Sequence, residues 1–374
     1  MPMNNNSLKI LHITLSSMIG GGPEHVLQLV RYFPKSITSF IAAPNRAPYG
    51  TRFMQTVGTK HLFTIPQRKI SIYLFLKLLQ FIRYNDIDII HSHGKGAGLY
   101  GRIAALFTGI PNIHTFHGVH LPINNAKRQA YLLLERILCN ISRTCIAVSP
   151  SEAEEVKSLH LCSNKLTTIV NGVEICAAVQ HTAKYNPFLL VHVSRFDPLQ
   201  KNSLWLLKLA QGLRQANLLD QCLFILIGDG EELPILRQQI HLQNMDKNFQ
   251  ILGSQPSVRP FLRGAGCYIS TSCWEGLPLA VLEAQAEGVP AVVSRVVGNT
   301  DAIEDGITGF TYPLNDVSSA VSCIRTLIND YNIWQSMSKA AYKRARKHFS
   351  VEYMAQQTAE LYKRVLASVR TSNL

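Results

Sequence analysis

The segment CYISTSCWEGLPLAVLEAQAEGVPAVVSR, residues 267–295, decides the fold because it passes from strand to helix and back to strand. Apolar CYISTS (267–272) predicts a buried strand, Gly276 frees a turn, and Pro278 suits the first position of a helix. LAVLEAQAEG then predicts a helix that ends at Gly288, and AVVSR (291–295) predicts the next strand. This order is the βαβ unit of a parallel sheet.

The same segment carries two glutamates around one helix start. Glu275 is expected on the loop and Glu283 inside the helix. The free N–H groups at Leu279 and Ala280, together with the helix dipole, favour an anion there. Carboxylates beside that anion can accept hydrogen bonds from hydroxyls, so the pattern predicts a sugar nucleotide ligand. The alternative is that both glutamates are solvated surface charges.

Strand-like runs recur along the whole chain and alternate with helical stretches. The first half has them at 8–16, 40–44, 61–66, 87–93, 112–118 and 144–150. After a polar break near residues 181–187 they restart at 188–196, 222–230, 249–254, 267–272, 291–295 and 309–312. The fold class predicted is therefore α/β, with two Rossmann-like, doubly wound domains facing a central cleft. Ligands in such sheets bind beyond the carboxyl ends of the strands, so function is expected between the halves.

Composition narrows the class of protein. The chain has 374 residues, of which 47% are hydrophobic, so two folded domains are expected and disorder is not. No run of eighteen apolar residues occurs, and the first residues resemble a strand, so neither a signal peptide nor a membrane span is expected. The eight cysteines form no C-x-x-C pair, which is typical of reduced, mostly buried thiols in a cytosolic protein.

Positive charge is concentrated in the first third of the chain. Residues 1–130 hold 14 Lys and Arg against 3 Asp and Glu, or +11, of the total of +13. Such a field can attract nucleic acid, an anionic lipid surface or a phosphate-bearing acceptor, or it can be surface charge without a specific role. No nucleic-acid-binding motif is present, so nucleic acid is disfavoured. Residues 68–85, with Lys77 and Arg83, predict an amphipathic or fully buried helix, and burial against the first sheet is favoured over membrane contact.

Cations and glycines follow several of the predicted strands. Arg195 ends one strand and Lys201 comes six residues later, a pair that suits a diphosphate unless both are solvated surface residues. Gly228, in Gly-Asp-Gly, would let a nucleotide approach the backbone. The loop GGGPE (20–24), with Gly21 and Gly22, suits a phosphate at a helix start, and a structural turn is the equal alternative.

Five histidines crowd two strand ends in the first half: His91, His93, His114, His117 and His120. No acidic residue lies among them between Asp88 and Glu135, and their spacing does not define a tetrahedral set, so a metal site is disfavoured. His117 precedes the flexible Gly118 at a strand end and is therefore the candidate catalytic histidine, against the alternative of a core histidine.

The motifs GGPE, HTFHG, VSPSE, VNGV, SRFDPLQKN, GDGEE and EGLPLAVLE occur in this order across essentially the whole chain. In this arrangement the chain resembles the retaining glycosyltransferases of family four, which have the GT-B fold. HSHGKGAGLYGRIAALFTGIP, followed by YLLLERILCN, further resembles bacterial members that build capsule, lipopolysaccharide or other lipid-linked glycans. Residues 296–299, VVGN, depart from the two consecutive glycines typical of the family, so the resemblance does not carry over a sugar preference.

The resemblance implies a role for each part. Residues 1–183 would bind the acceptor, residues 184–348 would bind the nucleotide sugar, and residues 349–374 would form a helix packed back on the first domain. Catalytic roles would fall to His117, facing the reacting sugar, and to Glu275, holding the donor sugar. The donor diphosphate would lie against Gly21, Gly22, Arg195, Lys201 and Leu279, and the nucleotide against Gly228 and Glu283.

The activity implied is retaining transfer of a sugar from a nucleoside diphosphate donor, a UDP-hexose or UDP-N-acetylhexosamine, to a lipid-linked or lipopolysaccharide or capsule acceptor. No cofactor and no metal are expected, because Arg195, Lys201 and the helix start would stabilise the leaving diphosphate. The expected location is the cytoplasm, at the inner face of the membrane, which the basic first half would contact. Two alternatives remain open: a GT-B epimerase acting on a UDP-sugar, and a catalytically silent protein that binds a nucleotide or glycan.

Overall fold

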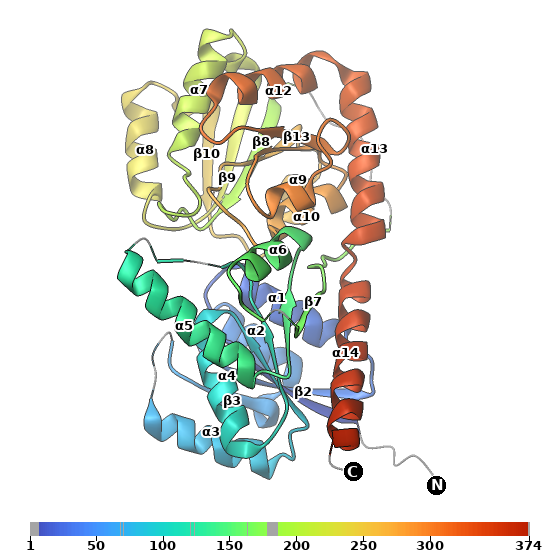
Figure 1. Ribbon diagram of the computed structural model, residues 1–374. Helices are drawn as coiled ribbons and strands as arrows, with labels where there is room; N and C mark the ends of the chain where they lie inside the picture. The colour runs from blue at the N-terminus through green and yellow to red at the C-terminus, as the bar shows by residue number, and fades with distance from the viewer. Residues whose placement is uncertain are drawn as a thin grey trace. The chain divides into compact units, whose positions relative to one another are not determined.

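The chain folds into two α/β units, shown in the computed structural model of Figure 1. The structure describes residues 7–372 except 68, 70, 120, 123, 163 and 178–185. The first unit comprises the chain up to Gly172 together with the segment from Val351 onward, and the second runs from Val173 to Ser350. The second unit starts at Val173, before residue 184, which was the domain boundary predicted from the sequence.

Seven parallel strands form the sheet of the first unit, in the order β3-β2-β1-β4-β5-β6-β7. The strands are β1 (Leu8–Ile13), β2 (Ile37–Ala43), β3 (Leu62–Thr64), β4 (Ile89–His93), β5 (Asn112–Thr115), β6 (Thr144–Ala147) and β7 (Leu166–Thr168). The helices are α1 (Gly21–Tyr32), α2 (Tyr49–Val57), α3 (Ile72–Tyr84), α4 (Lys95–Thr108), α5 (Asn125–Ile141), α6 (Pro150–Ser158) and α14 (Val351–Ser372), with a 3₁₀ turn, η1 (Thr59–His61). Strand order reverses between β1 and β4, which makes this the switch point of the sheet.

Helix α14 completes the core of the first unit although it is the last element of the chain. Its residues Met354, Ala355 and Tyr362 are buried against Ile10 and Ile113 of the sheet. The preceding helix ends at His348 and α14 begins at Val351, close to residue 349, where the last helix was predicted to begin. Burial of apolar side chains is the main favourable contribution to the free energy of packing a terminal helix against a sheet.

Six parallel strands form the sheet of the second unit, in the order β10-β9-β8-β11-β12-β13. They are β8 (Phe188–Ser194), β9 (Cys222–Gly228), β10 (Phe249–Gly253), β11 (Cys267–Ser270), β12 (Ala291–Ser294) and β13 (Gly309–Tyr312). The helices are α7 (Trp205–Gln215), α8 (Leu233–Leu242), α9 (Arg259–Leu262), α10 (Leu279–Ala286), α11 (Asn299–Ala302), α12 (Val317–Asn329) and α13 (Tyr331–His348), with η2 (Leu219–Gln221) and η3 (Asp246–Asn248). Here the order reverses between β8 and β11, so the segment that decided the fold begins at the switch point.

Most predicted strands run past the observed ones at their carboxyl ends. The strand expected at 112–118 ends at Thr115, and the one expected at 188–196 ends at Ser194. The chain leaves the sheet early at these places because the next residues form the loops that carry His117 and Arg195. Strand β7 was not predicted, because its three residues are too short to give a periodic pattern.

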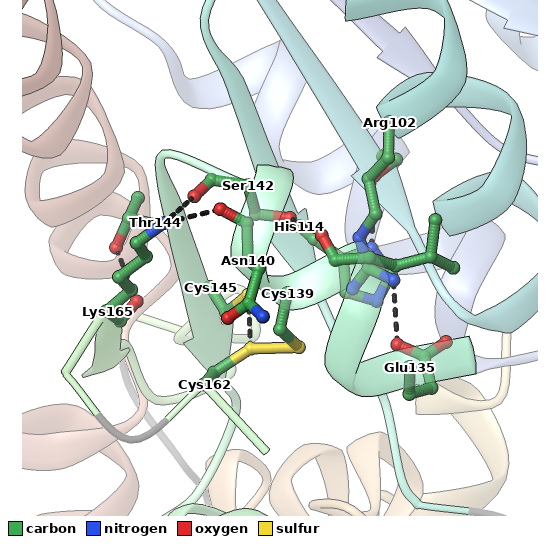
Figure 2. The surroundings of a disulfide bond; sticks show 12 residues. Arg102, His114, Glu135, Cys139, Asn140, Ser142, Thr144, Cys145, Cys162 and Lys165 are labelled. Carbon is green, nitrogen blue, oxygen red and sulfur yellow. Dashed lines mark hydrogen bonds and ion pairs between the residues drawn. A yellow bond between two sulfur atoms is a disulfide. The ribbon is translucent and has the colours of Figure 1, made fainter. Parts of the chain in front are cut away.

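The cysteines differ from the sequence expectation in one pair. Cys139 at the end of α5 and Cys162 after α6 form a disulfide. Figure 2 shows Cys145 of β6 beside this bond, with its thiol sulfur 2.8 Å from the sulfur of Cys162. The expectation of reduced thiols is therefore wrong for two of the eight cysteines, because the fold brings residues 23 positions apart into bonding distance. Cys145, Cys222 and Cys267 are free and buried, as expected.

Helix α3 is amphipathic and not fully buried. Leu78, Leu79 and Ile82 pack into the core, whereas Ile72 and Tyr73 are 78% and 65% exposed. Within the described part of the chain, no helix combines the length and the apolar character needed to cross a membrane.

Candidate functional site

The candidate residues of the second unit follow strands at the carboxyl edge of its sheet. Arg195 comes directly after β8, and Glu275 lies on the loop between β11 and α10. These strands are neighbours at the switch point, where a crevice opens at the edge of a parallel sheet. Lys201 lies on the loop between β8 and α7. The structure therefore brings these three residues to one edge.

Glu275 is held by three side chains. Lys201 Nζ lies 2.5 Å from Glu275 Oε1, and Ser272 Oγ donates to the same oxygen over 2.6 Å. Gln200 Nε2 donates to the other carboxylate oxygen over 3.3 Å. Glu275 is 8% exposed, so these contacts satisfy a buried carboxylate that would otherwise be costly. Its position is fixed before any ligand arrives.

Gln200 is a site residue that the sequence reasoning missed. Its amide oxygen accepts a 2.7 Å hydrogen bond from Arg195 Nη2, and its amide nitrogen donates to Glu275. The Arg195 side chain is exposed, so its remaining guanidinium donors can reach a ligand. The signal was present in the motif SRFDPLQKN, where Gln200 lies between the two cations, but a neutral amide gives no charge pattern to notice.

Two glycines allow the backbone of this site to pack closely. Gly228 ends β9 at φ +124°, and a Cβ built there would lie 1.8 Å from the carbonyl oxygen of Ser194. Gly298 has φ +81°, and a Cβ there would lie 2.8 Å from the carbonyl oxygen of Glu275. Only glycine fits either position. Gly228 therefore supports the strand ends around the site, and Gly298 supports the loop that carries Glu275.

Helix α10 begins at Leu279 and carries Glu283, which is half-buried, in its second turn. Pro278 is the residue before the helix, not its first residue, and the helix ends at Ala286, two residues before Gly288. The side chain of Pro278 makes no capping hydrogen bond, so the helix start suits an anion.

The glycine loop and the candidate catalytic histidine lie in the first unit, whereas Arg195, Lys201 and Glu275 lie in the second. Helix α1 begins at Gly21, and none of the described residues comes within 4 Å of a Cβ built on Gly22. Glu24 in the first turn accepts from Tyr49 Oη and Gln28 Nε2, each over 2.6 Å. Hydrogen bonds of Glu24 therefore anchor the helix that follows the glycine loop, and the backbone at Gly22 has open space beside it.

His117 lies on the loop after β5, the strand next to β4 in the first sheet. Its φ of +64° is unusual for a residue with a Cβ, and its side chain is half-buried. The loop is fixed by Glu152, whose buried carboxylate accepts hydrogen bonds from the N–H groups of Gly118 and Val148. Glu152 is a second residue that the sequence reasoning did not assign, although it ends the quoted motif VSPSE.

Burial favours the neutral form of the five buried histidines of this unit. Desolvation lowers the pKa of His12 to about 3 and that of His25 to about 4, and the nearby His25 adds to the effect on His12. Burial is also the main reason why the pKa values of His91, His93 and His114 lie well below the ordinary value. His25 and His12 come from α1 and β1, outside the two strand ends named from the sequence, and His120 lies outside the described residues.

Among the described residues, three side-chain groups could offer several ligand atoms to one metal ion. Ring nitrogens within 4.8 Å of one another occur in the set His12, His91 and His93 and in the set His25, His93 and His117. The sulfurs of Cys139, Cys145 and Cys162 form the third set, and two of them are joined in the disulfide. Imidazole groups of this kind suit Zn²⁺. The histidine sets were not expected, because tertiary packing adds His12 and His25 to the strand-end residues.

Two family models cover most of the chain. The model described as Glycosyltransferase Family 4 matches residues 19–175, and the model described as Glycosyl transferases group 1 matches residues 177–344. The boundary between them lies close to Val173, where the second unit begins.

Relatives and solved structures agree with the family models. The chain is 27% identical to the Escherichia coli UDP-Gal:alpha-D-GlcNAc-diphosphoundecaprenol alpha-1,3-galactosyltransferase, over 97% of this chain and 98% of that protein. It is 23% identical to the Staphylococcus aureus capsular polysaccharide biosynthesis glycosyltransferase CapM, over 77% of this chain and 79% of that protein.

The crystal structure of Anabaena HepE in complex with UDP and glucose superposes with a TM-score of 0.82 at 20% identity, over 95% of this chain and 99% of that one. At this identity the likeness establishes the fold, which is GT-B. The chain therefore belongs to the glycosyltransferases, with a family 4 domain followed by a group 1 domain.

Proposed function

We propose that the protein transfers a hexose or N-acetylhexosamine from a UDP-sugar to a lipid-linked glycan acceptor, with retention of the anomeric configuration. The observation that carries this proposal is the group Arg195, Lys201 and Glu275 at the switch point of the second sheet. Two cations beside a carboxylate suit a ligand with a diphosphate next to sugar hydroxyls. The E. coli relative supports the choice, since its name gives UDP-Gal as donor and a diphosphoundecaprenol-linked sugar as acceptor.

In this proposal the second unit stabilises the leaving diphosphate. Negative charge grows on the diphosphate as the glycosidic bond breaks, and Arg195, Lys201 and the start of α10 at Leu279 would neutralise it. A divalent cation is then not needed for the reaction. Glu275 and Glu283 would accept hydrogen bonds from hydroxyls of the donor sugar and the ribose, and Gly228 would face the nucleotide.

The first unit would supply His117 at the reacting sugar and Gly21 and Gly22 at the diphosphate. The open space over Gly22 supports this role, since a phosphate can approach the backbone there. In the retaining route proposed, the leaving phosphate takes the proton of the acceptor hydroxyl on the same face. The new glycosidic bond then forms as the bond to the diphosphate breaks.

A lipid-linked acceptor requires contact with a membrane, and one surface of the first unit suits this. The apolar-basic surface consists of Ile72, Tyr73, Leu76 and Lys77 on α3 with Leu106 and Phe107 on α4; the six side chains are exposed. Lys77 Nζ lies 4.4 Å from the ring centre of Tyr73, and Arg83 Nη2 donates to the carbonyl oxygen of Phe107 over 3.3 Å. Exposed apolar side chains among cations favour an anionic bilayer. The enzyme would then work in the cytoplasm, at the inner face of the membrane.

The test is a transfer assay with purified protein, a panel of UDP-hexoses and UDP-N-acetylhexosamines, and a membrane lipid extract, with and without EDTA. We expect UDP release that depends on lipid, survives EDTA and yields a glycolipid whose linkage retains the anomeric configuration. Conversion of the donor to another UDP-sugar without acceptor would show an epimerase instead. No release with any donor, with binding of UDP retained, would show a silent binding protein.

A further inference from the structure

A row of three histidines leads from the sheet of the first unit to His117. His12 Nδ1 of β1 lies 3.1 Å from His93 Nε2 of β4. On the other side of the same ring, His93 Nδ1 lies 3.5 Å from His117 Nε2. His12 and His93 are 0% and 5% exposed, so they stand behind His117 and away from solvent. The proposed function uses His117 but gives no role to the other two.

Neutral histidines in a row fix one another's protons. A neutral imidazole carries one N–H, so one ring nitrogen donates and the other accepts. Where two rings share a hydrogen bond, the tautomer of the first decides the tautomer of the second. Burial opposes a charged ring, so His12 and His93 are expected to be neutral.

The first ring of the row has a preferred tautomer. His12 Nε2 is buried and has no hydrogen-bond partner among the residues that the structure describes. A proton on that nitrogen would leave a buried donor unsatisfied, whereas a bare nitrogen leaves only an acceptor, which folded proteins tolerate better. The proton of His12 therefore belongs on Nδ1, from which it is donated to His93 Nε2.

The remaining protons follow from that choice. His93 accepts at Nε2, so its own proton is on Nδ1 and is donated to His117 Nε2. His117 accepts at Nε2, so its neutral ring carries the proton on Nδ1.

We propose that His12 and His93 are positioning residues that hold His117 in the Nδ1–H tautomer. Its role at the reacting sugar rests on the proposed function, in which His117 would then be a hydrogen-bond donor through Nδ1 and not a general base at Nε2. Hydrogen-bond donors placed where negative charge develops lower the barrier without a proton transfer.

The protons can be located without any substrate. Protein labelled with ¹⁵N in its histidine rings, compared with a His117→Gln variant to assign the signals, gives the tautomer of each ring by NMR at pH 7.5. We expect His117 to be bare at Nε2 and protonated at Nδ1. A proton on His117 Nε2 would overturn the proposal whether or not the protein transfers sugar, so this result is separate from the test of function.

A matched pair of variants tests the role of His12. His12→Asn keeps an N–H donor near the position of Nδ1, whereas His12→Leu removes it. We expect the asparagine variant to keep the tautomer of His117 and the leucine variant to mix both tautomers. In the transfer assay, His12→Leu should lower kcat about tenfold with KM within about twofold of wild type, as for loss of an interaction made in the transition state. Equal spectra for two folded variants would contradict the role of His12; if the leucine variant fails to fold, the wild-type spectrum decides.

Discussion

Gln200 joins Arg195 to Glu275: one end of its amide accepts from the guanidinium over 2.7 Å, and the other end donates to the carboxylate over 3.3 Å. A cation for the diphosphate and an acceptor for the sugar are thereby held in one hydrogen-bonded unit. Lys201, next in the chain, bonds Glu275 directly. Because both Gln200 and Lys201 contact Glu275, this residue is the first to replace.

Glu275→Ala should lower the transfer rate at least about 100-fold, because it removes a preorganised acceptor from the proposed site. The fold should be retained, since the lost ion pair is at the edge of the sheet and Lys201 can reach water. The check is kcat together with the far-UV circular dichroism spectrum. Asp220→Ala, which removes a carboxylate on the surface of the same unit, should leave the rate unchanged. Full activity of Glu275→Ala would remove Glu275 from the site.

The variant Gly22→Ala tests whether Gly22 contacts the ligand or only forms a structural turn. In the described part of the chain no atom comes within 4 Å of a Cβ at this position, so the substitution should not lower the melting temperature. If the diphosphate lies against this backbone, the added methyl group should raise the KM for the donor about tenfold or more. The measurements are donor saturation kinetics and thermal unfolding. An unchanged KM would favour the structural turn.

Glu152→Ala should destabilise the first unit by about 3 kcal/mol, because it leaves the half-buried N–H of Gly118 and the buried N–H of Val148 without their acceptor. Transfer should fall as well, since the same hydrogen bond fixes the loop that carries His117. Urea unfolding and kcat are the measurements. Glu154→Ala, an exposed position on the same helix, is the matched control and should change neither.

Replacing Lys77 and Arg83 together by alanine should weaken binding to anionic vesicles about 30-fold at low salt, at about 1 kcal/mol for each cation near the surface. Vesicle co-sedimentation with and without phosphatidylserine measures the effect. The pair Lys208→Ala and Arg237→Ala removes the same charge from exposed positions of the second unit and should bind like wild type. Equal binding of both double variants would contradict the proposed surface.

Acid should unfold the first unit before the second. The unfolded chain takes up protons on its histidines as pH falls through about 6.5, whereas burial lowers the pKa of His12 and His25 in the folded state to about 3 and about 4. Each such histidine therefore costs about 1.4 kcal/mol of stability per pH unit between pH 6.5 and its folded pKa, and stability is full above that range. The first unit buries His12, His25, His91, His93 and His114, and the second buries His192.

The two units can be followed separately because all three tryptophans, Trp205, Trp274 and Trp334, belong to the second unit. In urea titrations at pH 5.5, the loss of helical circular dichroism should begin before the change in tryptophan fluorescence. At pH 7.5 the gap between the two transitions should be smaller. A gap that does not change with pH would mean that the buried histidines do not govern the stability of the first unit.

The sequence was sufficient for the fold class and for the candidate residues near strand ends. Apolar runs separated by helical patterns define parallel strands, and the residue after each run must lie at the carboxyl edge of the sheet, so Arg195 and Glu275 could be placed near one another from local patterns. The order of the motifs indicated the family, and the family models that match residues 19–175 and 177–344 confirm it. These conclusions need only short-range periodicity and order along the chain.

Only the tertiary structure decided which side chains meet. Gln200 between the two charged groups, Glu152 behind the loop of His117, and the row from His12 through His93 depend on packing between strands and helices that are distant in sequence. The disulfide Cys139–Cys162 and the exposed apolar face of α3 were likewise decided there. Periodicity fixes which face of an element is apolar, but the partner of a buried polar group is set by where the whole chain places it.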